Sequence, residues 1–308
     1  MQFILRALIR GGIVATLATS LVASFAGPIG YSVRSDVDRH LYRIDLATGA
    51  ASDIGATGFS KIEGLAIDSN GELYGVNPST AQLVKCSAAT GACTAVGTLS
   101  GLPQSQTNAG LAFAANGSLY LAMNAVVYRV DPATATTAAL GGTGPALSGL
   151  AGVAPTTACQ SGLFGMGGNG DRGKFYCINV SNGSATLLGS LNGISPLDVG
   201  LDGDPVTGMV WGVTNDATGQ VFSVDPATLA VSDVNPVTVD GKAVGGFESL
   251  AVARTGTTAV NDPTAVAAPG PVVVSTLDGH SLALLLFGVL AVAVMSLRQR
   301  SHATLRRE

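Results

Sequence analysis

Short apolar runs alternate with turns rich in Gly, Asn, Asp and Thr between residues 31 and 254. Runs such as LYRID (41–45) and VYRVD (127–131) alternate apolar and polar positions and use β-branched or aromatic residues. This pattern is typical of strands that are buried on one face. No amphipathic helical period is found in the same region. We therefore predict an all-β body.

Two dipeptides indicate where strands turn back on themselves. Asn70-Gly71 and Asn116-Gly117 each lie between apolar runs. Asn-Gly is favoured in two-residue hairpin loops because both central residues there need a positive φ. The sequence therefore predicts tight hairpins at these two places.

One phrase, seen as LYRIDLATG at its first copy, recurs five times in the body. Its marker position, where an Asp or a similar small polar residue starts a turn, holds Asp45, Ser87, Asp131, Asn179 and Asp225. A repeat of about 40–50 residues with four short strands per unit is the signature of a β-propeller. An Asp or Asn in this place can accept backbone N–H groups of its own turn.

The two ends of the repeat region predict how the ring closes. The chain enters partway through a unit, and residues 245–253, here called the closing segment, match the strand that opens at residue 64. We expect this segment to complete the first blade and so to hide the free sheet edges. The prediction is five four-stranded blades, with six as the alternative if the Gly-rich stretch 155–174 holds extra strands. In fold the body resembles secreted NHL- and WD-type propellers, although it lacks the Trp-Asp signature.

The N-terminus has the features of a secretory signal peptide. A short basic region with Arg6 and Arg10 runs into an apolar stretch of small residues. Ser24 and Ala26 have the small side chains that signal peptidase accepts, so we place cleavage after Ala26, with Ala23 as the alternative. Residues 1–26 are then the signal peptide, and the other interpretation is an uncleaved anchor.

The C-terminus contains a single candidate membrane span. Residues 281–297 carry no charge and have about the minimum length for crossing a bilayer. Arginines follow it at once and predict a cytoplasmic end: Arg298, Arg300, Arg306 and Arg307. A Pro/Ala/Val-rich linker at 255–274 separates this region from the body.

The last 35 or so residues resemble the sorting signals read by exosortase-type systems of Gram-negative bacteria. The variant concerned has Ile/Val-Pro-Thr-Leu-Ser just ahead of a single span and a terminal Arg cluster. Here Val274-Ser275-Thr276-Leu277 occupies that place and keeps the Thr-Leu pair, with Ser275 standing for Pro. The resemblance implies that residues 275–308 are a sorting signal, of the IPTL type, recognised by an exosortase-type enzyme. A plain membrane anchor is the alternative.

All four cysteines lie in the body, and an even number in an exported chain favours disulfides. Cys86 and Cys93 flank a turn and occupy facing positions of a repeat hairpin. Cys159 and Cys177 then pair by elimination.

Charge and candidate chemistry narrow the function classes. Residues 31–270 hold 10 basic and 18 acidic side chains, a net charge of −8, which disfavours nucleic-acid binding. His40 is the single histidine of the body, so a Ser-His-Asp triad or a His-rich metal centre is hard to assemble. We interpret His40 as a solvent-exposed residue in a turn.

Acidic residues are the remaining candidates. Glu63 and Glu248 align, each just ahead of an apolar strand, and could face a central channel. Asp202-Gly203-Asp204 is interpreted as turn capping rather than a calcium loop. We assign no catalytic residue, no metal ligand and no cofactor.

The sequence predicts an exported, non-catalytic β-propeller with a binding or structural role at the cell surface or in the extracellular matrix. Its expected partners are the Sec translocon, signal peptidase and an exosortase-type enzyme, with an extracellular polysaccharide or surface protein as the ligand. The alternatives are an extracytoplasmic lactonase-like hydrolase and a membrane-anchored periplasmic scaffold or sensor.

Overall fold

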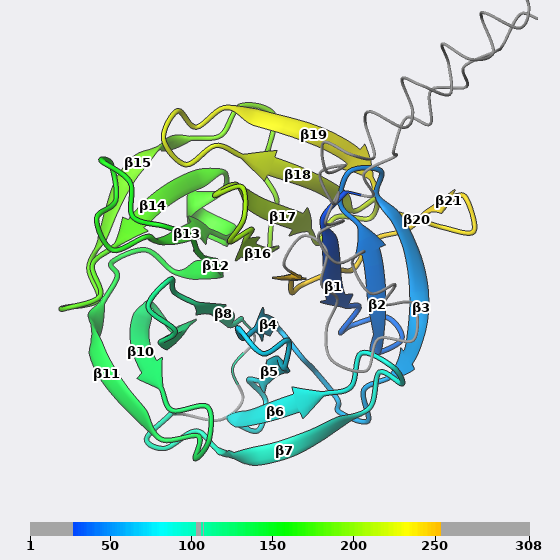
Figure 1. Ribbon diagram of the computed structural model, residues 1–308, viewed down its shortest axis with the longest axis horizontal. Helices are drawn as coiled ribbons and strands as arrows, with labels where there is room; N and C mark the ends of the chain where they lie inside the picture. The colour runs from blue at the N-terminus through cyan, green and yellow to red at the C-terminus, as the bar shows by residue number, and fades with distance from the viewer. Residues whose placement is uncertain (1–26, 103–105, 107, 254–308) are drawn as a thin grey trace, which may run out of the picture. The chain divides into compact units, whose positions relative to one another are not determined.

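The computed structural model describes residues 27–102, 106 and 108–253, and these form a five-bladed β-propeller (Figure 1). The predicted signal peptide, linker, sorting motif, membrane span and terminal arginines lie outside the described residues. Within the described part of the chain, no helix has the length and apolar character that a bilayer crossing needs.

Four blades follow one plan, in which consecutive antiparallel strands run from the centre of the ring outward. Blade 2 consists of β4 (Gly64–Ile67), β5 (Leu73–Asn77), β6 (Gln82–Cys86) and β7 (Cys93–Thr98). Blade 3 consists of β8 (Gly110–Phe113), β9 (Leu119–Met123), β10 (Val126–Val130) and β11 (Thr137–Gly142). Blade 4 consists of β12 (Leu147–Gly152), β13 (Leu163–Gly167), β14 (Lys174–Ile178) and β15 (Ala185–Ser190). Blade 5 consists of β16 (Val199–Gly203), β17 (Val210–Thr214), β18 (Gln220–Val224) and β19 (Val231–Pro236).

Blade 1 joins the two ends of the repeat region, as predicted. Its order from the centre is β22 (Ala251–Val252), β1 (Ile29–Val33), β2 (His40–Asp45) and β3 (Ala50–Ala56). Within the closing segment, β22 pairs with β1 through Gly30 opposite Val252 and Tyr31 opposite Ala251. A short outer hairpin of β20 (Thr238–Val239) and β21 (Lys242–Ala243) adds to the edge of β3.

The Gly-rich stretch 155–174 does not contain an extra blade. It provides β13 and a short 3₁₀ helix, Asn169–Asp171, within blade 4. The five-blade prediction is therefore confirmed over the six-blade alternative.

The recurring phrase forms the turn between the third and fourth strand of every blade. In each copy the side chain at the marker position accepts the backbone N–H of the second residue after it, at 2.8 to 3.3 Å: Asp45, Ser87, Asp131, Asn179 and Asp225. For Asp131 the N–H of Ala133 favours the ionised form and so lowers the pKa of the carboxyl. The turn prediction made from these residues is confirmed.

The Asn-Gly hairpins differ in detail from the prediction. Only the glycines have a left-handed backbone, with φ of 83° at Gly71 and 77° at Gly117. The loops are longer than two residues, since β4 ends at Ile67 and β5 begins at Leu73. In this longer loop the Asp68 carboxylate accepts the Asn70 and Glu72 N–H groups and allows a single positive-φ residue to complete the turn.

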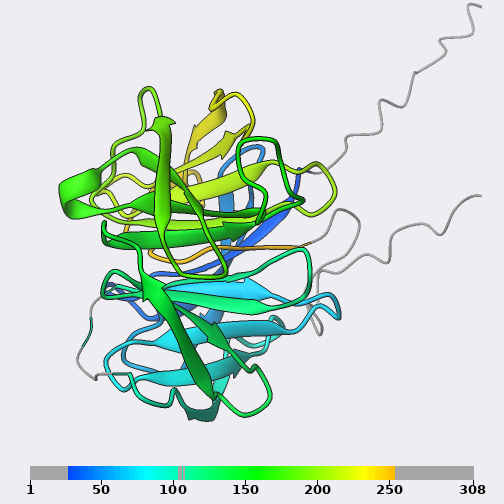
Figure 2. The same cartoon turned by 90° about the vertical axis from the view of Figure 1, so that its left-hand side faces the viewer.

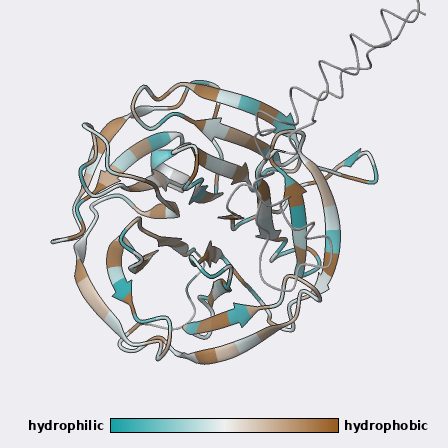
Figure 3. Cartoon of the chain, in the orientation of Figure 1, coloured by the Kyte–Doolittle hydropathy of each residue, from teal (hydrophilic) through white to brown (hydrophobic). Residues whose placement is uncertain are grey.

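The hydrophobic core lies between adjacent blades. Middle strands such as β13 and β17 are buried along their whole length, whereas outer strands such as β7 and β15 are largely exposed. Phe164 and Phe175 of blade 4 pack against Phe222 of blade 5, for example. Figure 2 views the ring from its edge, and Figure 3 shows hydrophobic segments in every blade interrupted by hydrophilic ones.

The inner strands approach one another so closely around the axis that they leave no room for a side chain at the positions occupied by glycine. A Cβ atom added to Gly200 would lie 2.3 Å from the backbone carbon of Ser249, and one added to Gly110 would lie 2.8 Å from the Leu150 nitrogen. Gly64 and Gly149 occupy the corresponding positions of blades 2 and 4. The centre of the ring is therefore a narrow passage.

Both predicted disulfides are present, and they pair all four cysteines. Cys86 and Cys93 join β6 to β7 within blade 2. Cys159, ahead of β13, joins Cys177 in β14 of blade 4. Such bonds form and persist in oxidising, extracytoplasmic compartments.

We expect the two disulfides to stabilise the body unequally. They close loops of sequence separation 7 and 18, and the chain-entropy model gives about 2.5 and 3 kcal/mol for loops of these sizes. The pair Cys159→Ser and Cys177→Ser should therefore lower the free energy of unfolding more than Cys86→Ser and Cys93→Ser. Guanidinium unfolding of the full chain in detergent, followed by the fluorescence of the buried Trp211, measures both losses. A larger loss for the shorter loop would contradict the prediction.

Candidate functional site

Three acidic side chains meet at one end of the axis. Glu63 directly precedes β4, Asp198 directly precedes β16, and Glu248 lies in the closing segment ahead of β22. One carboxylate oxygen of each lies within 4.8 Å of the others. Every inner strand is antiparallel to the next strand of its blade, so the inner strands run in the same direction along the axis and the residues just ahead of them converge at one end. We call these three residues the axial carboxylate cluster.

Glu63 is almost completely enclosed, with 2% of its surface exposed. Its Oε1 lies 2.8 Å from the Lys61 ammonium, which also lies 3.4 Å from Asp36 Oδ1. The backbone is fixed as well, since the Glu63 N–H donates to the Val76 carbonyl of β5. One lysine therefore faces two carboxylates in this corner of the site.

Glu248 is equally enclosed, with 3% of its surface exposed. Asn215 Nδ2 donates to its Oε1 at 2.6 Å. Its Oε2 is buried and has no hydrogen-bond partner among the described residues. The neighbouring Ser35 hydroxyl donates instead to the Ile62 carbonyl. A buried carboxylate oxygen without a donor is costly, and it calls for a ligand or a proton.

Asp198 connects the cluster to a different part of the ring. Its Oδ1 accepts the Val199 N–H at 2.8 Å, and its Oδ2 accepts Asn108 Nδ2 at 3.0 Å. Asn108 lies just ahead of blade 3, whereas Asp198 leads into blade 5. Polar groups ahead of several blades are thus linked across the axis.

The environment favours the neutral form of two members of the cluster. Burial raises the pKa of Asp198 to about 7, the Val199 hydrogen bond opposes this shift, and the Glu248 charge adds to it. Burial likewise raises the pKa of Glu248 to about 7, with Lys61 opposing and Asp36 adding to the shift. Carboxyls this close cannot all be ionised at neutral pH without a counter-charge. Chemically, the cluster can bind a cation or share protons.

The passage along the axis beside the cluster is lined mostly by glycine and by small or apolar residues, with Glu63 at its edge. Its walls include Glu63, Ala109, Ser148 and the axial glycines. Because the inner strands approach within side-chain distance of one another, the passage between them has no room for an organic substrate or for a water molecule.

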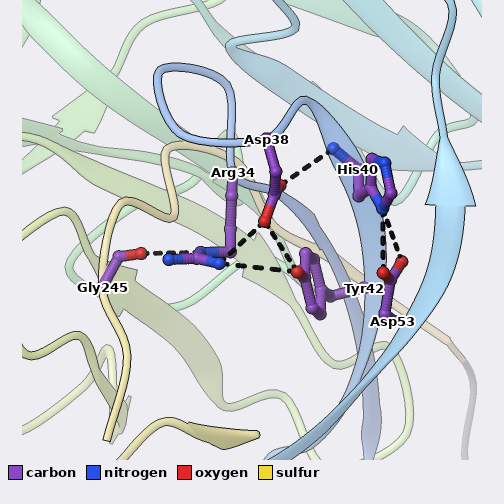
Figure 4. A network of polar contacts seen from close by, with 6 residues as sticks. All are labelled: Arg34, Asp38, His40, Tyr42, Asp53 and Gly245. Carbon is purple, nitrogen blue, oxygen red and sulfur yellow. Dashed lines mark hydrogen bonds and ion pairs between the residues drawn. The ribbon is translucent and has the colours of Figure 1, made fainter.

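A second polar network fixes the start of the closing segment (Figure 4). Arg34 donates through Nε to the Gly245 carbonyl at 2.8 Å and pairs with Asp38 at 2.8 Å. The guanidinium also lies over the rings of Tyr42 and Phe247. Arg34 therefore holds the segment that carries Glu248 against blade 1.

The structure brings together the two acids that the repeat alignment singled out, Glu63 and Glu248. Sequence reasoning missed Asp198 and Lys61. Asp198 lies one position ahead of the residue that aligns with Glu63, so the repeat phase gave no signal for it. The acidic phrase LDVGLDGD at 197–204 is the feature that could have drawn attention to it.

Other polar residues have structural roles elsewhere. His40 is not in a turn: it begins β2, and its Nδ1 lies 2.8 Å from Asp53 (Figure 4). Asp204 caps its own turn through the Val206 N–H and the Thr207 hydroxyl, as predicted. Asp202 does not cap a turn. It lies in β16, and its Oδ2 accepts the Val252 N–H of the closing segment at 2.8 Å.

No protein-family model matches the chain, and no curated protein sequence matches it. Among solved structures, a chain of a nidogen/laminin complex matches over 74% of this chain and 85% of its own length, with 14% identity and a TM-score of 0.47. Virginiamycin B lyase from Staphylococcus aureus matches over 67% of this chain and 69% of its own, with 15% identity and a TM-score of 0.40. Hydrazine synthase from Kuenenia stuttgartiensis matches over 57% of this chain, with 13% identity and a TM-score of 0.39, and this chain spans about half the length (49%) of that one.

Proposed function

We propose that this chain is an exported, non-catalytic β-propeller that acts at the cell surface or in the extracellular matrix. The observation that carries the proposal is the pairing of all four cysteines into two disulfides, in blades 2 and 4. Disulfides of this kind are characteristic of proteins that mature outside the cytoplasm.

The site favours binding over catalysis. The body has one histidine, His40, which is held by Asp53 and is not a member of the axial carboxylate cluster. The passage beside the cluster is too narrow for a substrate to reach the enclosed carboxylates from within the ring. The faces and rim of the ring are then the surfaces for an extracellular polysaccharide or a surface protein.

The proposed route of export rests on the sequences at the two ends of the chain. Residues 1–26 direct the precursor to the Sec translocon and signal peptidase. The span at 281–297 and its arginines hold the precursor in the inner membrane with the body outside. An exosortase-type enzyme then processes the chain near Thr276-Leu277, and the mature protein leaves the membrane.

A lactonase-like hydrolase is the second candidate, because the axial carboxylate cluster offers the oxygen ligands that a metal-dependent hydrolase needs. Lactone hydrolysis by the purified chain that is lost in Glu248→Gln would favour it. A membrane-anchored scaffold or sensor is the remaining alternative.

The fate of the C-terminus separates sorting from anchoring. With one tag inserted after residue 260 and another after residue 308, we expect the first in the surface or extracellular fraction and the second on a separate membrane fragment. Cells must carry an exosortase, and immunoblots of cell fractions measure both tags. Changing Thr276 and Leu277 to Ala should keep both tags in the membrane, whereas Val272→Ala, just upstream of the motif, should not. Both tags on one membrane-embedded polypeptide in the unmodified chain would overturn the sorting proposal.

A further inference from the structure

The axial carboxylate cluster presents only oxygen ligands to its centre. Glu63, Asp198 and Glu248 each contribute one carboxylate oxygen, all within 4.8 Å of one another. The described residues bring no histidine or cysteine into this group. Such a set suits hard cations such as Ca²⁺ and Mg²⁺ rather than Zn²⁺ or Cu²⁺.

The surrounding charges leave the cluster short of positive charge. When ionised, Asp36, Glu63, Asp198 and Glu248 carry four negative charges, and Lys61 is the one cationic side chain paired with them among the described residues. Lys61 is already shared between Asp36 and Glu63. A divalent cation would offset most of the remaining charge, which enclosure makes costly to leave unpaired.

A second observation also indicates a missing ligand. Oε2 of Glu248 is enclosed and accepts no hydrogen bond of normal geometry from the described residues, while Asn215 donates to Oε1. The Asp36 carboxyl lies beside Glu248 and, when ionised, is itself an acceptor. The side chain is therefore fixed in place with one oxygen unoccupied. Polar groups buried in this way normally have a partner.

We infer that the axial carboxylate cluster binds one divalent cation, and that this cation is Ca²⁺. Ca²⁺ accepts oxygen ligands at 2.3–2.6 Å in irregular geometry, so it does not require the three carboxylates, which come from separate segments with their oxygens within 4.8 Å of one another, to form a regular polyhedron. Mg²⁺ requires near-octahedral ligands at about 2.0–2.1 Å and gives up its water reluctantly. This inference goes beyond the proposed function and does not depend on the route of export.

The bound ion would connect segments that lie far apart in the sequence. Glu63 leads into blade 2, Asp198 leads into blade 5, and Glu248 belongs to the closing segment of blade 1. A cation shared by the three links the closing segment to the blades on both of its sides. Calcium would then stabilise the closed ring in the compartment to which the chain is exported.

The test is calorimetric titration of CaCl₂ into the full chain, purified in detergent and freed of metal with EDTA. We expect one Ca²⁺ per chain, bound with a dissociation constant in or below the range of about 10⁻⁴–10⁻³ M known for extracellular modules. Glu248→Gln should weaken binding at least tenfold, and Glu63→Gln combined with Glu248→Gln should abolish it. MgCl₂ should bind at least tenfold more weakly than CaCl₂.

The matched control is Glu72→Gln, which removes the same charge from a residue paired with Lys85 at 2.8 Å on blade 2. Its calcium affinity should stay within twofold of the unmodified chain. Trp211 fluorescence confirms folding, and Asp198→Asn replaces Glu248→Gln if the latter fails to fold. Absence of calcium binding, or binding that survives the double substitution, would overturn the inference. Equal or tighter binding of Mg²⁺ would overturn the assignment of the ion. The experiment with tags after residues 260 and 308 tests the sorting proposal without reference to calcium. Failure of the calcium inference can therefore be told apart from failure of the proposed function.

Discussion

Removal of the closing segment, residues 245–253, is expected to abolish the single cooperative unfolding transition of the chain. The segment supplies the inner strand of blade 1, which pairs with β1, and it carries the buried side chains of Phe247 and Leu250. Without it, β1 becomes a free edge and the hydrophobic surface between blades 1 and 5 is exposed. Guanidinium unfolding of the full chain in detergent, followed by Trp211 fluorescence and by circular dichroism, would show broad and non-coincident transitions.

A point substitution in the same segment gives a graded version of this prediction. Phe247 is fully buried and packs edge-on against Tyr42, with ring centroids 5.5 Å apart. Phe247→Ala should lower the free energy of unfolding by about 3–5 kcal/mol, as expected for a large buried aromatic residue. Leu187→Ala, at a side chain that is about half exposed (52%), serves as the control and should cost less than about 1 kcal/mol. Similar losses for both variants, or an unchanged transition after the deletion, would show that closure does not hold the ring together.

The closure could be predicted from the sequence because it depends on repetition. The phrase around Asp45 and its four later copies set the blade period, and the closing segment repeats the strand that opens at Gly64. Local turn chemistry at the marker residues needs no long-range information, so it was predictable too. The geometry of the Asn-Gly turns was less predictable from the sequence. In the first of them the Asp68 carboxylate accepts backbone N–H groups of a longer loop, in which only Gly71 has a positive φ.

The candidate site was predictable only in part, for the same reason. Glu63 and Glu248 occupy the same position of the repeat, just ahead of an inner strand, so aligning the repeats was enough to single them out together. Asp198 is out of phase by one residue, and the positions that align with Lys61 ahead of the other inner strands hold no lysine. Their meeting depends on how the ring brings the entries of blades 1, 2 and 5 to one end of the axis, which a linear pattern does not contain.

The inner strand of blade 5 departs from the repeat at the point where the ring is closed. The position that holds Ala66, Ala112, Ala151 and Ala251 in the other inner strands holds Asp202 in β16. Its two carboxylate oxygens accept the N–H groups of Gly203 and Val252, each at 2.8 Å. Because Val252 belongs to β22, this side chain joins the last blade to the closing segment. The departure from the repeat therefore has a structural reason.

Asp202→Ala would restore the repeat consensus, and we nevertheless expect it to destabilise the protein. It leaves two N–H groups without their acceptors, at least one of them in the buried interior, at a cost of about 2–4 kcal/mol below the unfolded pKa, where the carboxyl is neutral in both states. The loss should shrink as the pH rises. Complete burial raises the pKa of Asp202 well above its ordinary value, the two backbone hydrogen bonds oppose this shift, and the nearby Asp204 charge adds to it. A carboxyl whose folded pKa is raised contributes stability that is full below the unfolded pKa and is lost as the pH rises through the folded pKa.

Urea unfolding of the full chain and of Asp202→Ala near pH 5 and near pH 8 measures this difference, and the other titrating groups cancel because both proteins share them. Asp202→Asn is the matched variant, because it keeps one acceptor oxygen and does not titrate. The stability difference between the Asn and Ala variants should therefore be the same at both pH values, whereas that between Asp and Ala should fall. A cost of Asp202→Ala that grows with pH would mean that the ionised carboxylate is the form that holds the closing segment, with the Val252 and Gly203 hydrogen bonds outweighing the cost of burial.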